Sequence, residues 1–292
     1  VLNFGENPMT SRPFQQVDVF TATPYLGNPL AVVLDGTGLS TEAMQHFTDW
    51  THLSECTFVL PPTTEGHAAG ADYRVRIFCP GRELPFAGHP TLGTCHAWLK
   101  AGGQPRAGQH VVQECGVGLV RIRREGERLA FAAPPLRRSG PLDDADLALI
   151  AQGLGIARED IVAHAWCDNG PGWRGVMLRS AAQVLAVRPD PVALAGLEIG
   201  LVGPQPAGSD TAFEVRAFFP GLQVLAEDPV TGSLNAAVAQ WLMGAGLAPA
   251  NYIASQGTAI NRAGRVHLER DADGTIWVGG ASVTCIAGEV TL

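Results

Sequence analysis

Runs of apolar residues predict several short strands in the first part of the chain. Residues 14–21 place apolar side chains at four of eight positions, and residues 30–34 form a continuous apolar run that is typical of a buried strand. Residues 56–60 form a third run, which two prolines end. Between the second and third strands, Ser40 can cap a helix that runs to about Trp50.

Two stretches further along have the pattern of buried helices. Leu92, Cys95, His96 and Leu99 follow helical spacing, and residues 234–243 are apolar almost all round. The rest of the pattern consists of short, irregularly alternating strands with 35 glycines, which favours an α+β fold over a regular βαβ stack. We expect curved, mostly antiparallel sheets wrapped around these helices.

The chain also repeats a segment. Residues 73–81 (YRVRIFCPG) and 213–221 (FEVRAFFPG) are identical at five of nine positions. About eight residues later each copy reaches a proline, which follows His89 in the first copy and Asp228 in the second. The two registers differ by one residue, so we expect a single insertion between the copies.

This duplication predicts two similar domains, each a curved sheet around a central helix. The expected bounds are residues 14–132 and 133–281, and a last strand near residues 282–292 can return to the first domain. Residues 1–13 carry no regular pattern and are expected to lead into the first strand.

Composition and charge exclude several classes of function. Hydrophobic residues make up 46% of the chain and charged residues 16%, with a net charge of -8. A phosphate-binding surface needs clustered Lys and Arg, so we expect no nucleic-acid partner. No apolar run of membrane-spanning length and no leader pattern are visible, which predicts a cytoplasmic protein without a membrane partner. None of the six cysteines forms a C-x-x-C pair, so we expect reduced thiols and no metal site.

Both proline segments resemble helix starts that can bind an anion. A proline suits the first helical position, which would place His89 and Asp228 at cap positions. Helix N-termini present free N–H groups and partial positive charge, and Gly88 and Gly232 let a ligand approach the backbone. A carboxylate is therefore an expected ligand, while a capping aspartate and a core histidine are the structural alternatives.

Glu55 is a third candidate, at the mouth of the apolar strand 56–60. Apolar walls raise the pKa of a carboxyl group, which suits a residue that takes up and releases protons near neutral pH. The alternative is an exposed glutamate at the edge of a strand.

Several stretches resemble the phenazine-biosynthesis PhzF-like family, which is similar in fold to diaminopimelate epimerase. They occur in the family's order and cover most of the chain from residue 14 onward. One departure is Val266, where the resemblance implies a proline in a loop near the cleft. The matching stretches are DVFTATPYLGNPLAVVL (18–34), LSECTFVLPP (53–62), DYRVRIFCPGRELPFAGHPTLGT (72–94), EDPVTGSLNAAVAQWL (227–242) and SQGTAINRAGRVHLE (255–269).

The resemblance implies an isomerase that needs no cofactor and shifts a proton on a dihydro-hydroxyanthranilate or another small carboxylate. It implies that Glu55 is the acid/base, and that His89 and Asp228 act beside it in a cleft between the two domains. Family members commonly form homodimers, so we expect a homodimer. The residues expected to contact the substrate are Asn28, Gly88, Thr91, Gly232 and Ser233.

Two other functions stay open at this point. A racemase or epimerase of an ordinary amino acid could use the same cleft, and so could a non-catalytic protein that binds a small acid. Diaminopimelate epimerase uses two facing thiols, but the repeat gives Cys79 the counterpart Phe219 and Cys95 the counterpart Leu234. This disfavours a symmetric two-thiol racemase.

Overall fold

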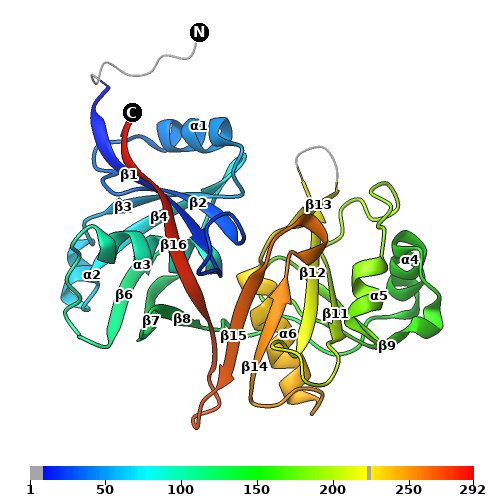
Figure 1. Cartoon of the computed structure of the whole chain (residues 1–292). Helices are drawn as coiled ribbons and strands as arrows, with labels where there is room; N and C mark the ends of the chain where they lie inside the picture. Colours follow the sequence, from blue (N-terminus) through cyan, green and yellow to red (C-terminus); the bar gives the residue numbers. More distant parts are fainter. Residues whose placement is uncertain (1–8, 222–224) are drawn as a thin grey trace. The chain divides into compact units, whose positions relative to one another are not determined.

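Two structural units share the polypeptide. A computed structural model describes residues 9–221 and 225–292 (Figure 1). The first unit runs to Phe131 and takes in Gly280–Leu292, and the second is Ala132–Gly279. Among the helices of the described residues, none has both the length and the apolar character that a membrane crossing requires.

The first unit contains the strands and the helix that the apolar pattern predicts. Ser40 caps helix α1 by accepting a hydrogen bond from the backbone N–H of Ala43. Strand β1 begins at Ser11, earlier than expected, because it pairs with distant residues of β16; the lead-in residues 1–8 lie outside the described residues. The elements are β1 (Ser11–Val19), β2 (Asn28–Val33), α1 (Thr41–Thr51), β3 (Cys56–Leu60), α2 (Thr64–Ala68), β4 (Tyr73–Cys79), β5 (Arg82–Leu84), α3 (Gly88–Lys100), β6 (His110–Cys115), β7 (Gly118–Glu125) and β8 (Arg128–Ala132).

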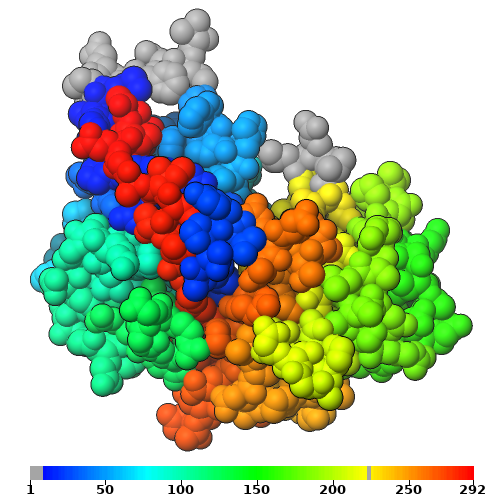
Figure 2. Space-filling view, in the orientation of Figure 1, coloured from blue at the N-terminus to red at the C-terminus, as the bar shows by residue number. Residues whose placement is uncertain are grey.

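The second unit repeats this order after an extra helix. Its elements are α4 (Asp144–Leu154), η1 (Arg158–Asp160), β9 (Ile161–Trp166), β10 (Arg174–Leu178), α5 (Ala181–Ala186), β11 (Ile199–Pro204), β12 (Phe213–Pro220), β13 (Leu225–Asp228), α6 (Gly232–Gly244), β14 (Asn251–Gln256), η2 (Thr258–Ile260), β15 (Gly264–Arg270) and β16 (Ile276–Thr291). The long strand β16 begins in this unit beside β15 and continues into the first unit, where it pairs with β1. In the space-filling view of Figure 2 the red atoms of the last residues lie against the blue atoms of the first described ones.

The strands of the two units form one hydrogen-bonded sheet, and the two halves of its order have the same topology. The order is β1-β2-β3-β4-β6-β7-β8 in the first unit and β9-β10-β11-β12-β14-β15-β16 in the second, with β16 beside both β8 and β15 and also paired with β1. In each half of this order the second and third strands are parallel to each other, and so are the fourth and fifth, while the other neighbours are antiparallel. The short strands β5 and β13 lie off this order and form antiparallel hairpins with β4 and β12. The predicted α+β class, with a mostly antiparallel sheet and a central helix in each unit, is confirmed.

Strand β3 is buried on both faces, which explains its continuous apolar run. Phe58 packs in a cluster with Phe47 of α1. The next residue toward the N-terminus, Thr57, faces the other way and accepts a hydrogen bond from Thr94 of α3 at 2.8 Å. The sheet therefore separates an outer helix, α1, from the central helix α3.

The central helices pack closely on their sheets. Helix α3 contacts β1, β2, β3 and β6, and most of its residues are buried. A Cβ at Gly93 would lie 2.6 Å from a methyl group of Leu30 and 2.8 Å from one of Val19. In the second unit a Cβ at Gly200 would lie 2.3 Å from Leu234 of α6. Glycine at these contacts lets helix and strand approach each other.

The expected starts of the two helices are wrong in detail. Helix α3 begins at Gly88 after the N-cap Ala87, so His89 is its second residue and Pro90 its third. A proline anywhere in the first turn is tolerated, because the N–H groups there have no partner within the helix. Asp228 is not a cap, since it still pairs in the β12–β13 hairpin and the N-cap of α6 is Thr231.

The register of the repeat also differs from the expectation. Strands β4 and β12 match with Tyr73 at Phe213, 140 residues apart (73 and 213), whereas the helix starts Gly88 and Gly232 are 144 residues apart (88 and 232). The second copy thus has four extra residues rather than one, between β12 and β13. The prolines misled the alignment because they occupy different positions relative to the helix.

The corrected register changes which residues correspond. Asp228 matches Leu84, since Ile77 pairs with Leu84 as Ala217 pairs with Asp228. By the helix starts, His89 matches Ser233. The counterpart of Cys95 becomes Ala239 instead of Leu234, so the two units still carry no matched pair of thiols.

The repeated Val-Arg-x-Phe segment makes the same ion pair in both units. Arg76 donates two hydrogen bonds to Glu83 across the first hairpin, at 2.8 and 2.6 Å. Arg216 donates two to Glu227 across the second, at 2.9 and 2.8 Å. The first pair is partly exposed, whereas Arg216 is buried and also donates to two backbone carbonyls of the α5 region.

Candidate functional site

Glu55 lies immediately before β3, and the sheet holds it mostly out of water. Its side chain is 17% exposed, so the alternative of a fully exposed strand-edge glutamate does not hold. One carboxylate oxygen, Oε2, lies 3.4 Å from Nε2 of His89. The structure therefore brings together two of the three residues expected to be catalytic.

His89 is buried at the start of α3, and its environment keeps the imidazole neutral. Burial lowers the pKa of His89 from 6.5 to about 3, against a smaller opposing effect of a hydrogen bond with the backbone of Pro29. At neutral pH the imidazole is consequently uncharged, and its contact with Glu55 is not a pair of opposite charges. The other ring nitrogen, Nδ1, lies 3.5 Å from Nδ2 of Asn28.

Asn28 and Thr91 are both fully buried in the first unit. Asn28 begins β2 and contacts the His89 ring, and its contact with a substrate stays a prediction. Thr91 accepts a hydrogen bond from Gln113 of β6 at 3.0 Å, and the Gln113 carbonyl accepts one from Tyr73 at 3.0 Å. Thr91 thus belongs to a buried chain of hydrogen bonds beneath α3, and its contact with a substrate stays a prediction.

Asp228 is held at the end of β13 by the turn that leads into α6. Its Oδ2 accepts a hydrogen bond from the Thr231 hydroxyl at 2.6 Å, and its backbone carbonyl accepts one from Gln256 at 3.1 Å. Gln256 is fully buried, and its carbonyl accepts from the backbone N–H of Thr231 and from the side chain of Asn235. One glutamine of β14 therefore organises this whole helix start.

Ser233 is the second residue of α6 and is partly exposed. Its hydroxyl accepts a hydrogen bond from the indole N–H of Trp173 at 3.1 Å, and its backbone carbonyl accepts one from Asn169 at 2.8 Å. Gly232 begins the helix and is buried. The first N–H groups of a helix have no partner within it and favour an anion, so this corner can bind a carboxylate.

Sequence reasoning missed four buried polar residues that shape these helix starts. In the first unit Gln113 donates to Thr91, and in the second Gln256 accepts from Asn235. The corrected register makes Thr91 and Asn235 equivalent but not the two glutamines, since Gln113 pairs with Tyr73 whereas Ala254, not Gln256, pairs with Phe213. A single glutamine in a strand carries no spacing signal. The other two missed residues, which hold Ser233, are Asn169 and Trp173.

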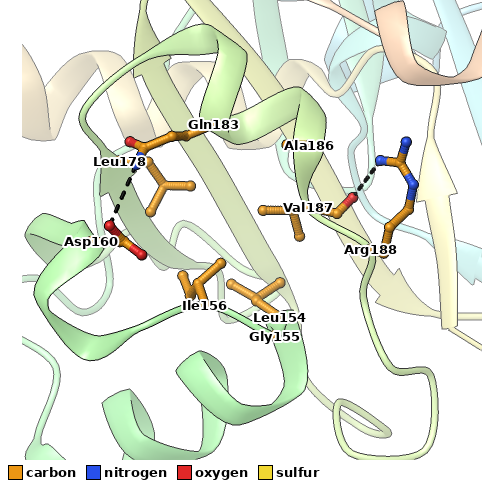
Figure 3. Close-up of a pocket in the computed structure, with 9 residues that line it drawn as sticks. All are labelled: Leu154, Gly155, Ile156, Asp160, Leu178, Gln183, Ala186, Val187 and Arg188. Carbon is orange, nitrogen blue, oxygen red and sulfur yellow. Dashed lines mark hydrogen bonds between the residues drawn. The ribbon is translucent and has the colours of Figure 1, made fainter.

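A separate hollow of the second unit contains none of the expected site residues. It has a volume of about 420 Å³ and lies between α4, η1 and α5 (Figure 3). Its polar groups already have protein partners: Gln183 donates to Asp160 at 3.4 Å, and Arg188 donates to the carbonyl of Val187 at 3.0 Å. The residues that line it are Leu154, Gly155, Ile156, Asp160, Leu178, Gln183, Ala186, Val187 and Arg188.

Comparison with known proteins places the chain in a family. The sequence model of the family described as "Phenazine biosynthesis-like protein" matches residues 17–288. The chain is 34% identical over 300 residues to antisense-enhancing sequence 1 of Schizosaccharomyces pombe, covering 96% of this chain and 99% of that protein. It is 34% identical over 219 residues to trans-2,3-dihydro-3-hydroxyanthranilate isomerase of Pseudomonas aeruginosa, covering 74% of each.

A solved structure agrees with the sequence comparison. The crystal structure of a phenazine biosynthesis protein of the PhzF family from Enterococcus faecalis superposes with a TM-score of 0.79 at 25% identity, covering 97% of this chain and 100% of that one. The expected family and fold are thereby confirmed. With the family pattern spanning most of its length and with relatives that are named isomerases, this chain belongs to the phenazine biosynthesis-like family of isomerases.

Proposed function

We propose that this protein shifts a proton on a small carboxylate that carries an amino or hydroxyl group, with Glu55 as the acid/base and without a cofactor. The observation that carries the proposal is the contact of a mostly buried carboxylate, Glu55, with a buried, neutral imidazole, His89. A carboxylate in such a setting can take a proton from one carbon and return it to another.

The neutral state of His89 supports this division of roles. A protonated imidazole 3.4 Å away would stabilise the charged carboxylate of Glu55 and make it a weaker base. With its pKa lowered to about 3, His89 is instead a neutral hydrogen-bonding group at the pH of the cell. Its proposed role is to orient Glu55 and the substrate, with Asn28 fixing the far side of the ring.

The helix start of α6 supports the choice of a carboxylate substrate. We propose that the Ser233 hydroxyl and the N–H groups around Gly232 bind the carboxylate, and that Asp228 binds the amino or hydroxyl group of the same molecule. The relative from Pseudomonas aeruginosa is named for a compound with all three groups, a dihydro-hydroxyanthranilate. Gly88, at the start of α3, has no side chain and would let the substrate come close to a second stretch of backbone.

The test is the variant Glu55→Gln, which keeps the shape of the side chain and removes its basicity. The substrate to assay first is trans-2,3-dihydro-3-hydroxyanthranilate, followed by small amino and hydroxy acids. We expect a melting temperature close to that of the wild type and a loss of turnover of at least 100-fold, the usual scale of general acid–base catalysis. Glu65→Gln, at an exposed position of α2, is the matched control and should retain full activity. Full activity of Glu55→Gln would refute the assignment.

A further inference from the structure

One loop of the second unit holds Ser233 by two buried side chains. The loop joins β9 to β10 and contains Asn169 and Trp173, which are 9% and 4% exposed. Trp173 donates its indole N–H to the Ser233 hydroxyl, and Asn169 donates its side-chain N–H to the Ser233 carbonyl. Both donors are thus buried, while the residue that receives them is partly open to solvent.

The loop itself is fixed by internal hydrogen bonds. Oδ1 of Asp168 accepts from the N–H groups of Gly170 and Gly172, at 2.7 and 3.0 Å, and the N–H of Cys167 donates to the carbonyl of Trp173 at 2.9 Å. Gly170 and Gly172 have φ angles of 147° and 92°, which side-chain-bearing residues rarely adopt. The position of the Trp173 indole is therefore set by the backbone of the loop.

The chemistry of the two partners fixes the direction of the Ser233 hydroxyl. An indole N–H can only donate, whereas a hydroxyl group both donates and accepts. Because Ser233 accepts from Trp173, its own hydrogen must point to a different acceptor, and no acceptor for it is found within residues 9–221 and 225–292. At the same helix start the side-chain oxygen of Asn169 is buried and has no hydrogen-bond partner in that part of the chain.

We propose that Trp173 is a positioning residue, which holds the Ser233 hydroxyl as a donor for the substrate carboxylate. This inference rests on the proposed function and adds a residue to the carboxylate end of the proposed site. The amino and hydroxyl groups of the substrate are left to Asp228, as proposed above.

The test is the binding of 3-hydroxyanthranilate, an aromatic acid that carries both groups, measured by titration calorimetry. Trp173→Phe removes the indole N–H and keeps most of the ring. We expect it to weaken binding about five- to tenfold, as the loss of one hydrogen bond does. In a Ser233→Ala background the same substitution should have no further effect, because the two residues act as one unit. Trp277→Phe, which removes an indole hydrogen bond to Asp271, is the control and should bind like the wild type.

The outcomes separate this inference from the proposed function. Equal weakening by Trp173→Phe with and without the Ser233 hydroxyl would show an effect of packing and overturn the positioning role. Binding by Trp173→Phe that equals the wild type overturns the positioning role and leaves the proposed function standing. A wild-type protein that binds neither of these two anthranilates, 3-hydroxyanthranilate and trans-2,3-dihydro-3-hydroxyanthranilate, nor any of the small amino and hydroxy acids overturns the proposed function, and the role of Trp173 falls with it.

Discussion

The duplicated hairpins allow one prediction in which the protein supplies its own control. Arg76–Glu83 and Arg216–Glu227 have the same geometry but differ in exposure. In the first pair the side chains are 23% and 38% exposed, and in the second they are 4% and 13% exposed. We predict that Glu227→Gln destabilises the protein much more than Glu83→Gln.

The expected magnitudes follow from burial. Removing one partner of a buried ion pair leaves an uncompensated charge and costs about 3–5 kcal/mol. Arg216 keeps its bonds to the carbonyls of Val184 and Val187 in the variant, so we expect the lower end, about 3 kcal/mol. An exposed pair such as Arg76–Glu83 is worth about 0.2–1 kcal/mol because water and salt screen it.

The assay is urea unfolding followed by circular dichroism, with the two variants compared at equal slope of the transition. Glu227→Gln, in the second hairpin, should lower the free energy of unfolding by about 2 kcal/mol more than Glu83→Gln in the first. Adding salt should reduce the effect of Glu83→Gln and leave that of Glu227→Gln nearly unchanged. Equal losses for the two variants, or a larger loss at Glu83, would contradict the argument from burial.

Three further predictions concern His89, Gly93 and Gln256. The pKa of His89 is lowered to about 3 in the folded protein, so the unfolded chain binds more protons than the folded one between pH 3 and 6.5. The stabilising effect of neutral His89 is therefore complete above pH 6.5 and is lost as the pH falls. His89→Gln should flatten the curve of unfolding free energy against pH between pH 4 and 6 by up to about 1.4 kcal/mol per pH unit, measured by urea titrations. Gly93→Ala should destabilise by about 1–3 kcal/mol because its Cβ meets two buried methyl groups, whereas Gly244→Ala, at an unobstructed position, should be neutral or slightly stabilising; a melting comparison with the reverse order would refute this. Gln256→Leu should cost about 2 kcal/mol or more, measured by urea unfolding, since it leaves buried donors of Asn235 and of the α6 start without their acceptor; a loss under 0.5 kcal/mol would count against the role of Gln256.

Local patterns were enough to predict much of the fold. The strand over Cys56–Leu60 and the helix capped by Ser40 appear within a residue of where apolar runs and capping place them. The repeat predicted the duplicated topology, because a Val-Arg-x-Phe-x-Pro-Gly segment includes the arginine that pairs across each hairpin. These strands, caps and hairpins depend on residues that are close together in the sequence, so a local pattern can predict them.

The details of the helix starts could not be predicted in the same way. The four extra residues of the second hairpin shift Asp228 from the expected cap into the end of β13, and only the pairing of Ala217 with Asp228 shows it. The early start of β1 depends on its distant partner β16. Trp173, Asn169 and the two glutamines act through contacts far apart in sequence, and no local signal distinguishes them from ordinary core residues.

The most direct measurement is to run the reaction in D₂O and follow the product by mass spectrometry and ¹H NMR. If a single glutamate carries the proton from one carbon of the acid to another, the receiving carbon of the wild-type product should hold the substrate's own hydrogen, or one deuterium where the glutamic acid exchanges with solvent before it delivers the proton. No other carbon should gain deuterium, and protein with glutamine at position 55 should form no product. Product that forms as fast in the glutamine variant as in the wild type would contradict the account.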